Sequence, residues 1–167
     1  MSRLAILWPL TALIAGGCGD RPQEAPPESA MVPGAIFEGL PLSGNLATAL
    51  AAGFGNCIDG THGLRCRKEG VALMGVGPLS AAVDLDAARE GSPARFDHVT
   101  LWHASDQGAV LDLSPKLAKA GWQSCLTPDA ERFWHPPSPF RIAIDTNYWG
   151  SRRLVISAPP PSRAPYC

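Results

Sequence analysis

Pairs of aspartates and of histidines in this chain could carry acid–base chemistry or bind a metal. Asp84 and Asp86 stand two residues apart, so on a β-strand their carboxylates would lie on the same face. They alternate with apolar residues, which favours the solvent side of an edge strand over a catalytic pair. His98 and His103 are five residues apart and would lie on opposite faces of one strand. We therefore expect no metal site.

Motifs for a nucleophile or a phosphate loop are also missing from the sequence. Ser80 follows the letters GVGPL, which do not form the G-x-S-x-G turn of a hydrolase. The same letters lack the lysine of a phosphate-binding loop. Gly75, Gly77 and Pro78 instead predict a bulge or bend that divides one long strand. These patterns predict no enzyme, no catalytic residue and no cofactor. The alternative, a small hydrolase with a dispersed site, would need a cleft that joins a histidine to a carboxylate.

Aromatic and cationic residues gather in one segment near the C-terminus. Tyr148, Trp149, Arg152 and Arg153 stand in NYWGSRR, between two apolar runs, which predicts a hairpin tip. Tyrosine, tryptophan and arginine are enriched among the residues that dominate binding interfaces. A sugar, a carboxylate or a partner loop could bind there. The alternative is that the aromatic rings pack onto the sheet while the arginines stay solvated. Trp102 is expected in or beside the core.

The N-terminus has the parts of a secretory leader. Arg3 supplies a positive charge and residues 4–14 form an apolar run, which is shorter than the ~20 residues that span a bilayer. Ala15-Gly16-Gly17-Cys18 then resembles the lipobox of bacterial lipoprotein precursors. The resemblance implies cleavage before Cys18, lipidation of its thiol and acylation of its new amino group. The alternative is a secreted protein in which Cys18 joins a disulfide.

The lipobox resemblance also implies a location. Several acyl chains on one residue anchor a protein stably, because each buried CH₂ contributes ~0.8 kcal/mol. Gly19, and not an aspartate, follows Cys18, which points to the outer membrane over the inner one in a Gram-negative cell. We expect the domain to face the periplasm from the cell envelope.

The four remaining cysteines predict disulfides. Cys57, Cys66, Cys125 and Cys167 form an even set, and an oxidising envelope favours two bridges. Four cysteines allow three pairings. Cys57–Cys66 is the local one, and Cys125–Cys167 would then tie the C-terminal tail to the domain. The spacings fit no zinc pattern.

Composition divides the chain into four parts. Residues 1–17 are the leader, 18–34 the lipidated cysteine and a Pro-rich tether, 35–158 one domain, and 159–167 a Pro-rich tail. The net charge is −1, so no basic field argues for nucleic acid. The 17 glycines and 17 prolines indicate many turns and short elements.

A short internal sequence repeat suggests how the domain is built. LAAGFGNC recurs as LAKAGWQSC, with Gly53 and Gly121 aligned at an offset of 68. Each glycine follows a predicted helix, over 45–52 and 113–120, where a left-handed cap belongs. Three strands are expected after each helix. The fold class is therefore α+β, with two α-β-β-β units in one antiparallel sheet, both helices on one face, and disulfides.

This arrangement is similar to small envelope lipoproteins and to secreted inhibitors built from α/β-hairpin repeats. A fold of this kind serves many functions. We expect a lipid-anchored, non-catalytic binding or assembly module for another envelope protein or a cell-wall component. The main alternative is an enzyme-inhibitor module that uses the loop between Cys57 and Cys66.

Overall fold

The protein is described from a computed structural model, in which residues 36–60, 63–87, 94–136, 138–146 and 151–158 are described. The chain divides into a unit of residues 1–30, outside the described residues, and a unit of residues 31–167 that holds the domain. Cys18 and its lipobox therefore lie outside the described residues. The elements of the domain are β1 (Ile36–Phe37), β2 (Leu40–Pro41), α1 (Leu46–Ala51), β3 (Gly55–Gly60), β4 (Gly63–Leu73), β5 (Val76–Asp86), β6 (Phe96–Trp102), α2 (Leu113–Lys119), β7 (Gln123–Leu126), β8 (Ala130–Trp134), β9 (Arg141–Asp145) and β10 (Leu154–Ser157).

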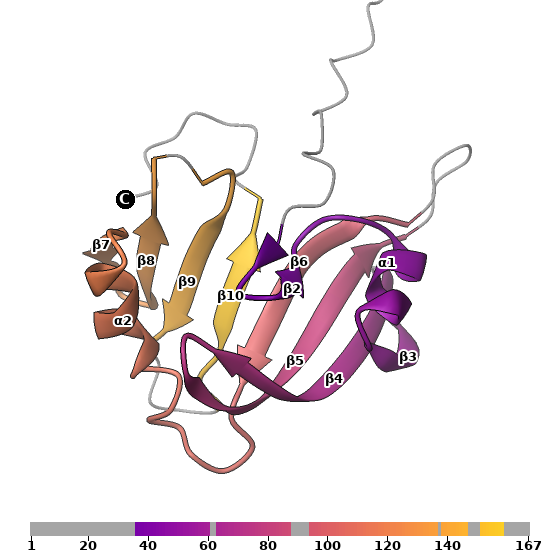
Figure 1. Ribbon diagram of the computed structural model, residues 1–167, viewed down its shortest axis with the longest axis horizontal. Coiled ribbons are helices and arrows are strands. Elements are labelled where there is room, and N and C mark those ends of the chain that lie inside the picture. Colours follow the sequence, from indigo (N-terminus) through magenta and orange to yellow (C-terminus); the bar gives the residue numbers. More distant parts are fainter. Residues whose placement is uncertain (1–35, 61–62, 88–93, 137, 147–150, 159–167) are drawn as a thin grey trace, which may run out of the picture. The chain divides into compact units, whose positions relative to one another are not determined.

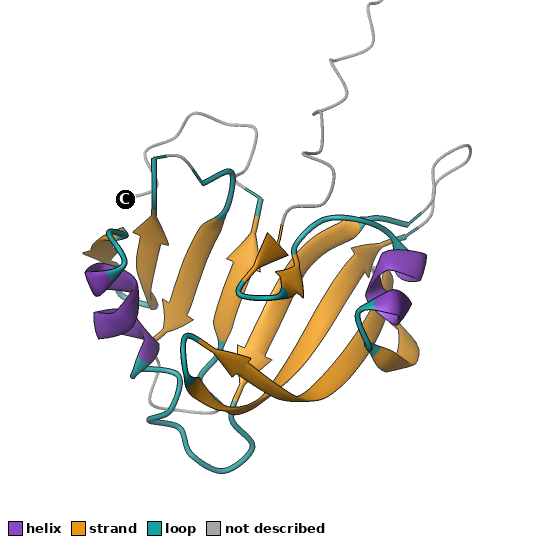
Figure 2. Ribbon diagram, in the orientation of Figure 1, coloured by secondary structure: helices purple, strands orange, loops and turns teal. Residues whose placement is uncertain are grey.

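Eight strands form one antiparallel sheet in the order β3-β4-β5-β6-β10-β9-β8-β7 (Figure 1). Strands β1 and β2 pair separately, and the two helices are short (Figure 2). Each helix precedes four consecutive strands, and the two runs of four meet where β6 pairs with β10. The antiparallel sheet is confirmed, but the prediction of three strands per unit is wrong. The missed strands, β3 and β7, are the sheet edges and are too exposed to show an apolar alternation.

The long bent strand predicted around Gly75 is also wrong. The chain reverses at Met74 and Gly75, which have φ angles of 48° and 75°, and Leu73 pairs with Val76 across the turn. Two residues with positive φ give a turn whose twist matches that of the flanking strands. Strand β5 therefore lies between β4 and β6, so the expectation that Asp84 stands on an edge strand is corrected as well.

The helix ends confirm the predicted caps. After α1, the N–H of Gly53 donates to the Leu50 carbonyl and that of Phe54 to the Ala49 carbonyl, each at 3.0 Å. Gly121 and the residue after it repeat this pattern behind α2. The two glycines have φ angles of 85° and 88°, the left-handed conformation that other residues adopt at a cost. The aligned glycines of the sequence repeat, Gly53 and Gly121, thus share one backbone geometry.

One face of the sheet and both helices contribute to a single apolar core. Its largest fully buried side chains are Phe54, Phe133, Leu73, Leu79, Leu85, Leu101, Leu113, Leu117, Ile142, Ile144, Leu154 and Ile156. Within strands these residues alternate with side chains of the opposite face. We call that opposite face the open face; it carries Arg67, Trp102, Ala143 and Val155. Among the described residues, no helix has the length and apolarity needed to cross a membrane.

A disulfide joins the edge strand β3 to its neighbour. It links Cys57 to Cys66, which confirms the local pairing. Cys125 of β7 is disulfide-bonded as well. Cys167 lies outside the described residues, so its pairing with Cys125 stays a prediction.

Candidate functional site

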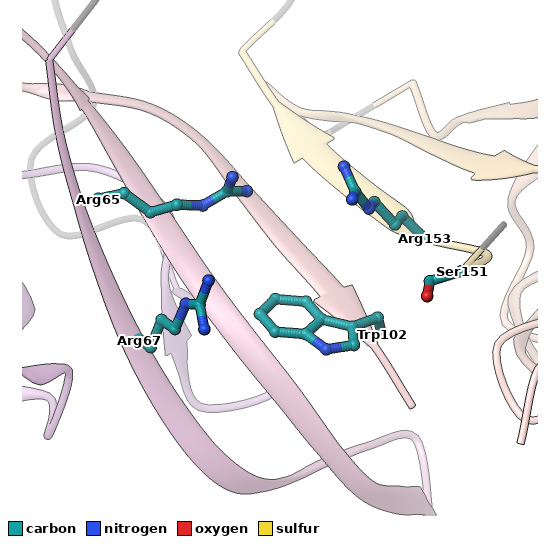
Figure 3. Close-up of a pocket in the computed structure, with 5 residues that line it drawn as sticks. All are labelled: Arg65, Arg67, Trp102, Ser151 and Arg153. Carbon is teal, nitrogen blue, oxygen red and sulfur yellow. The ribbon is translucent and has the colours of Figure 1, made fainter. Parts of the chain in front are cut away.

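Three arginines and a tryptophan surround a cavity on the open face. Arg65 and Arg67 come from β4, Trp102 from the end of β6, and Ser151 and Arg153 from the segment before β10 (Figure 3). The cavity has a volume of about 200 Å³ and opens to solvent. Residues that are far apart in the chain therefore meet at one place.

The strand register brings these side chains together. Arg67 pairs with Ala82 of β5, which pairs with Thr100 of β6. Ala82 and Thr100 are small and buried, so longer side chains from neighbouring positions extend over them. Leu101 pairs with Leu154, which places the next residues along these strands, Trp102 and Arg153, close to each other. The register thus places the long side chains that line the cavity on one face of the sheet, on either side of the small residues Ala82 and Thr100.

Two of the three guanidinium groups have no anionic partner in the part of the chain that the structure describes. These groups belong to Arg67 and Arg153. The Arg67 guanidinium lies 6.0 Å from the centroid of the Trp102 ring, within reach of a cation–π interaction. Figure 3 shows the side chains of Arg65 and Arg153 extending toward one another from opposite sides. The cavity therefore presents concentrated positive charge beside an aromatic surface.

An ion-pair network holds the third arginine. Arg65 Nη2 lies 3.2 Å from Asp84 Oδ2, and the same oxygen lies 3.0 Å from His98 Nε2. The other ring nitrogen, His98 Nδ1, lies 2.6 Å from Asp97 Oδ2. Both ring nitrogens of His98 therefore face carboxylates. The network orients Arg65 at the rim of the cavity.

A second cavity, of about 570 Å³, adjoins this network and bears on the hydrolase alternative. Its lining includes His98 together with the carboxylates of Asp84, Asp86 and Asp97. It is the cleft between a histidine and carboxylates that this alternative requires. No serine, threonine or cysteine is among its described lining residues, so these residues supply no hydroxyl or thiol nucleophile to the cleft.

The structure places only part of the predicted aromatic and cationic cluster, Tyr148, Trp149, Arg152 and Arg153, at the cavity. Strands β9 and β10 pair as a hairpin, which confirms the element, but Tyr148 and Trp149 lie outside the described residues. Arg153 lines the cavity. The backbone N–H of Arg152 donates to Gln107 Oε1 at 2.6 Å, and Arg152 is not part of the lining. The predicted pair of arginines thus contributes one residue to the site.

Sequence reasoning missed Arg65, Arg67 and Trp102. Trp102 was expected in or beside the core, yet it is half-buried on the open face. The two arginines flank Cys66, which is fully buried, so the letters RCR carried a signal. Two cationic side chains on one face of a strand, with a buried residue between them, predict a charged sheet surface.

The described residues contain no group of three histidine, cysteine or acidic side chains placed to hold a metal ion. His103, which lies just after β6, instead supports the following turn: its Nδ1 accepts a hydrogen bond from the backbone N–H of Asp106 at 2.8 Å.

In comparisons with known proteins, no family model, no curated protein and no solved structure matches the chain. The geometry alone defines the class: an antiparallel-sheet domain with an arginine–tryptophan cavity on its open face.

Proposed function

We propose that this protein is a lipid-anchored envelope protein whose domain is a non-catalytic binding module for another envelope protein, with a cell-wall component as the second kind of ligand. The observation that carries the proposal is the open-face cavity. It combines Arg67 and Arg153, which form no ion pair within the described chain, with the half-buried Trp102. Arginine and tryptophan are the residue types most enriched at interface hot spots.

In our proposal, neither helix covers the open face, so a partner can reach it. Ala49 of α1 and Leu113 and Leu117 of α2 belong to the same core cluster as Val99 and Leu101 of β6. We infer that both helices pack on the core face and that the two halves of the sheet are repeats of one α-β-β-β-β unit. A partner would then reach the open face without displacing any core element.

The lipid anchor is supported by the resemblance of residues 15–18 to a lipobox. Residues 18–34 would act as a tether that spaces the domain from the membrane. The protein would face the periplasm, from the outer membrane in a Gram-negative cell. Its partner would then be a neighbour in the same envelope.

We predict that Cys18 carries the lipid. Cells given an alkyne analogue of palmitate should label the wild-type protein. Cys18→Ala should abolish the label and release the protein from membranes, because all of the acyl chains of the proposed anchor are attached to this one residue. In-gel fluorescence after click chemistry measures the label. An unlabelled wild-type protein would instead place Cys18 in a secreted chain, where it is free to join a disulfide.

Photo-crosslinking in intact cells tests the binding function. A p-benzoylphenylalanine at Ser151, which is exposed and lines the cavity, should give one dominant protein adduct. The matched control places the same group at Leu126, which is 75% exposed and lies on β7, away from the cavity. Mass spectrometry identifies the adducts. The same adducts from both positions, or none from Ser151 despite full incorporation, would contradict binding through the open face.

One further observation favours a second candidate, an enzyme-inhibitor module. The Cys57–Cys66 disulfide ties the edge hairpin of β3 and β4, and Ile58 on that hairpin is 54% exposed. An inhibitor of this kind would insert the hairpin into an enzyme. It would be distinguished by adducts from position 58 to an enzyme whose activity the purified protein lowers.

A further inference from the structure

We infer that the open-face cavity is a binding site for the carboxylate of an acidic side chain on a partner protein. The inference rests on the proposed function and specifies the chemistry of its ligand. It is carried by the lining of the cavity, which comprises three arginines, one serine and one tryptophan and includes no acidic residue among the described lining residues.

The arginines are suited to a carboxylate by shape as well as charge. A guanidinium group is planar and presents paired N–H donors that match the two oxygens of a carboxylate. The side chains of Arg65 and Arg153 extend toward each other across the cavity, so a carboxylate between them would face donors from β4 and from the segment before β10 (Figure 3). The Ser151 hydroxyl adds one more donor at the same cavity.

The acidic groups that face this region are already engaged. Asp84 lies against Arg65 and His98, and Glu69 Oε2 accepts a hydrogen bond from Ser80 Oγ on the neighbouring strand. Arg67 and Arg153 therefore supply the positive charge that remains for a ligand. An incoming anion would compensate these two groups without breaking an existing pair.

The size of the cavity limits what can enter. Its volume of about 200 Å³ falls below the roughly 300–1,000 Å³ of sites that enclose a small molecule. One end group fits, and the rest of the ligand stays outside. Trp102 gives an apolar wall against which the methylene groups of a glutamate can pack. A side chain presented by a protein surface meets all of these conditions.

Nuclear magnetic resonance on the lipidated protein, purified in a nonionic detergent, tests the site with defined probes. The probes are N-acetylglutamate N-methylamide, the matching glutamine derivative and inorganic phosphate. The readouts are the indole N–H signal of Trp102, assigned with Trp102→Phe, and the Nε–H signals of the arginines. We expect a saturable shift with the glutamate derivative, with a millimolar dissociation constant because so small a ligand makes few contacts, and none with the glutamine derivative.

Variants then locate the binding. Arg67→Gln combined with Arg153→Gln should weaken glutamate binding at least about tenfold, the usual size of losing hydrogen bonds to a charged group. Arg152→Gln combined with Lys119→Gln is the matched control, since it also removes two positive charges but at residues outside the cavity lining. Unchanged backbone signals show that each variant is folded.

Three outcomes overturn the inference. The first is an equal shift with both amino-acid derivatives, and the second is no saturable shift with the glutamate derivative. The third is tighter binding of phosphate at the same signals, which would assign the cavity to a phosphate-bearing polymer. None of these measurements uses a partner protein, so they can fail while crosslinking from Ser151 succeeds, and the reverse also holds.

Discussion

A Gly63→Ala variant is expected to lose about 3 kcal/mol of its free energy of unfolding, or to fail to fold. Gly63 begins β4 with a φ angle of +154°, and a Cβ atom there would lie 1.9 Å from the carbonyl oxygen of Leu85. That oxygen belongs to the backbone of the paired strand β5, so no side-chain rotation relieves the contact. Urea unfolding of the oxidised protein measures the loss through the midpoint of the transition.

Gly55→Ala is the matched control for this substitution. Gly55 also begins a strand, β3, but a Cβ atom there would meet nothing within 4 Å. We expect its free energy of unfolding to change by less than about 1 kcal/mol. If both variants unfolded at the same urea concentration as the wild-type protein, the close pairing of β4 with β5 at Gly63 would be refuted.

The structural features that could be predicted from the sequence are those that depend on residues close together in the chain. The glycines that end both helices can be identified from their positions in the sequence, because a left-handed cap depends only on adjacent residues. Strands β6, β9 and β10 show apolar alternation because one of their faces is buried in the core. The Cys57–Cys66 bridge joins positions nine residues apart across adjacent strands.

Other elements lacked such a signal. The edge strand β3 is exposed along most of its length, so its side chains carry no alternation. The reversal at Met74 and Gly75 lies within an apolar stretch, and methionine rarely adopts the positive φ that the turn requires. The sequence therefore predicted a bent strand where the chain forms a hairpin.

The cavity itself depends on contacts that are remote in the chain. Arg67 on β4 and Arg153 beside β10 are brought together only because β5 and β6 stand between those strands in a fixed register. A one-residue shift in any of these pairings would turn a lining side chain toward the core. Charge and aromatic content near the C-terminus pointed to Arg153, but nothing local linked it to Arg67.

Reversing the charge at Arg67 and Arg153 is expected to have the largest effect on function. Arg67→Glu with Arg153→Glu should weaken binding of the protein captured from Ser151 by at least about 100-fold, because like charges placed opposite each other at an interface cost several kcal/mol. Wild-type affinity should fall as salt rises, since the cavity opens to solvent and its charges are screened. Titration of the purified partner at two salt concentrations measures both effects.

The measurement to make is the affinity of that double variant for the captured protein, set against a second double variant with the same change in net charge. Arg152→Glu with Lys119→Glu serves this purpose, because neither residue lines the cavity. If the open-face cavity is the binding site, the first variant loses at least about 100-fold and the second less than about threefold. Equal losses in the two variants would show that net charge alone governs the interaction, and unchanged affinity in the first would place the interface elsewhere on the domain.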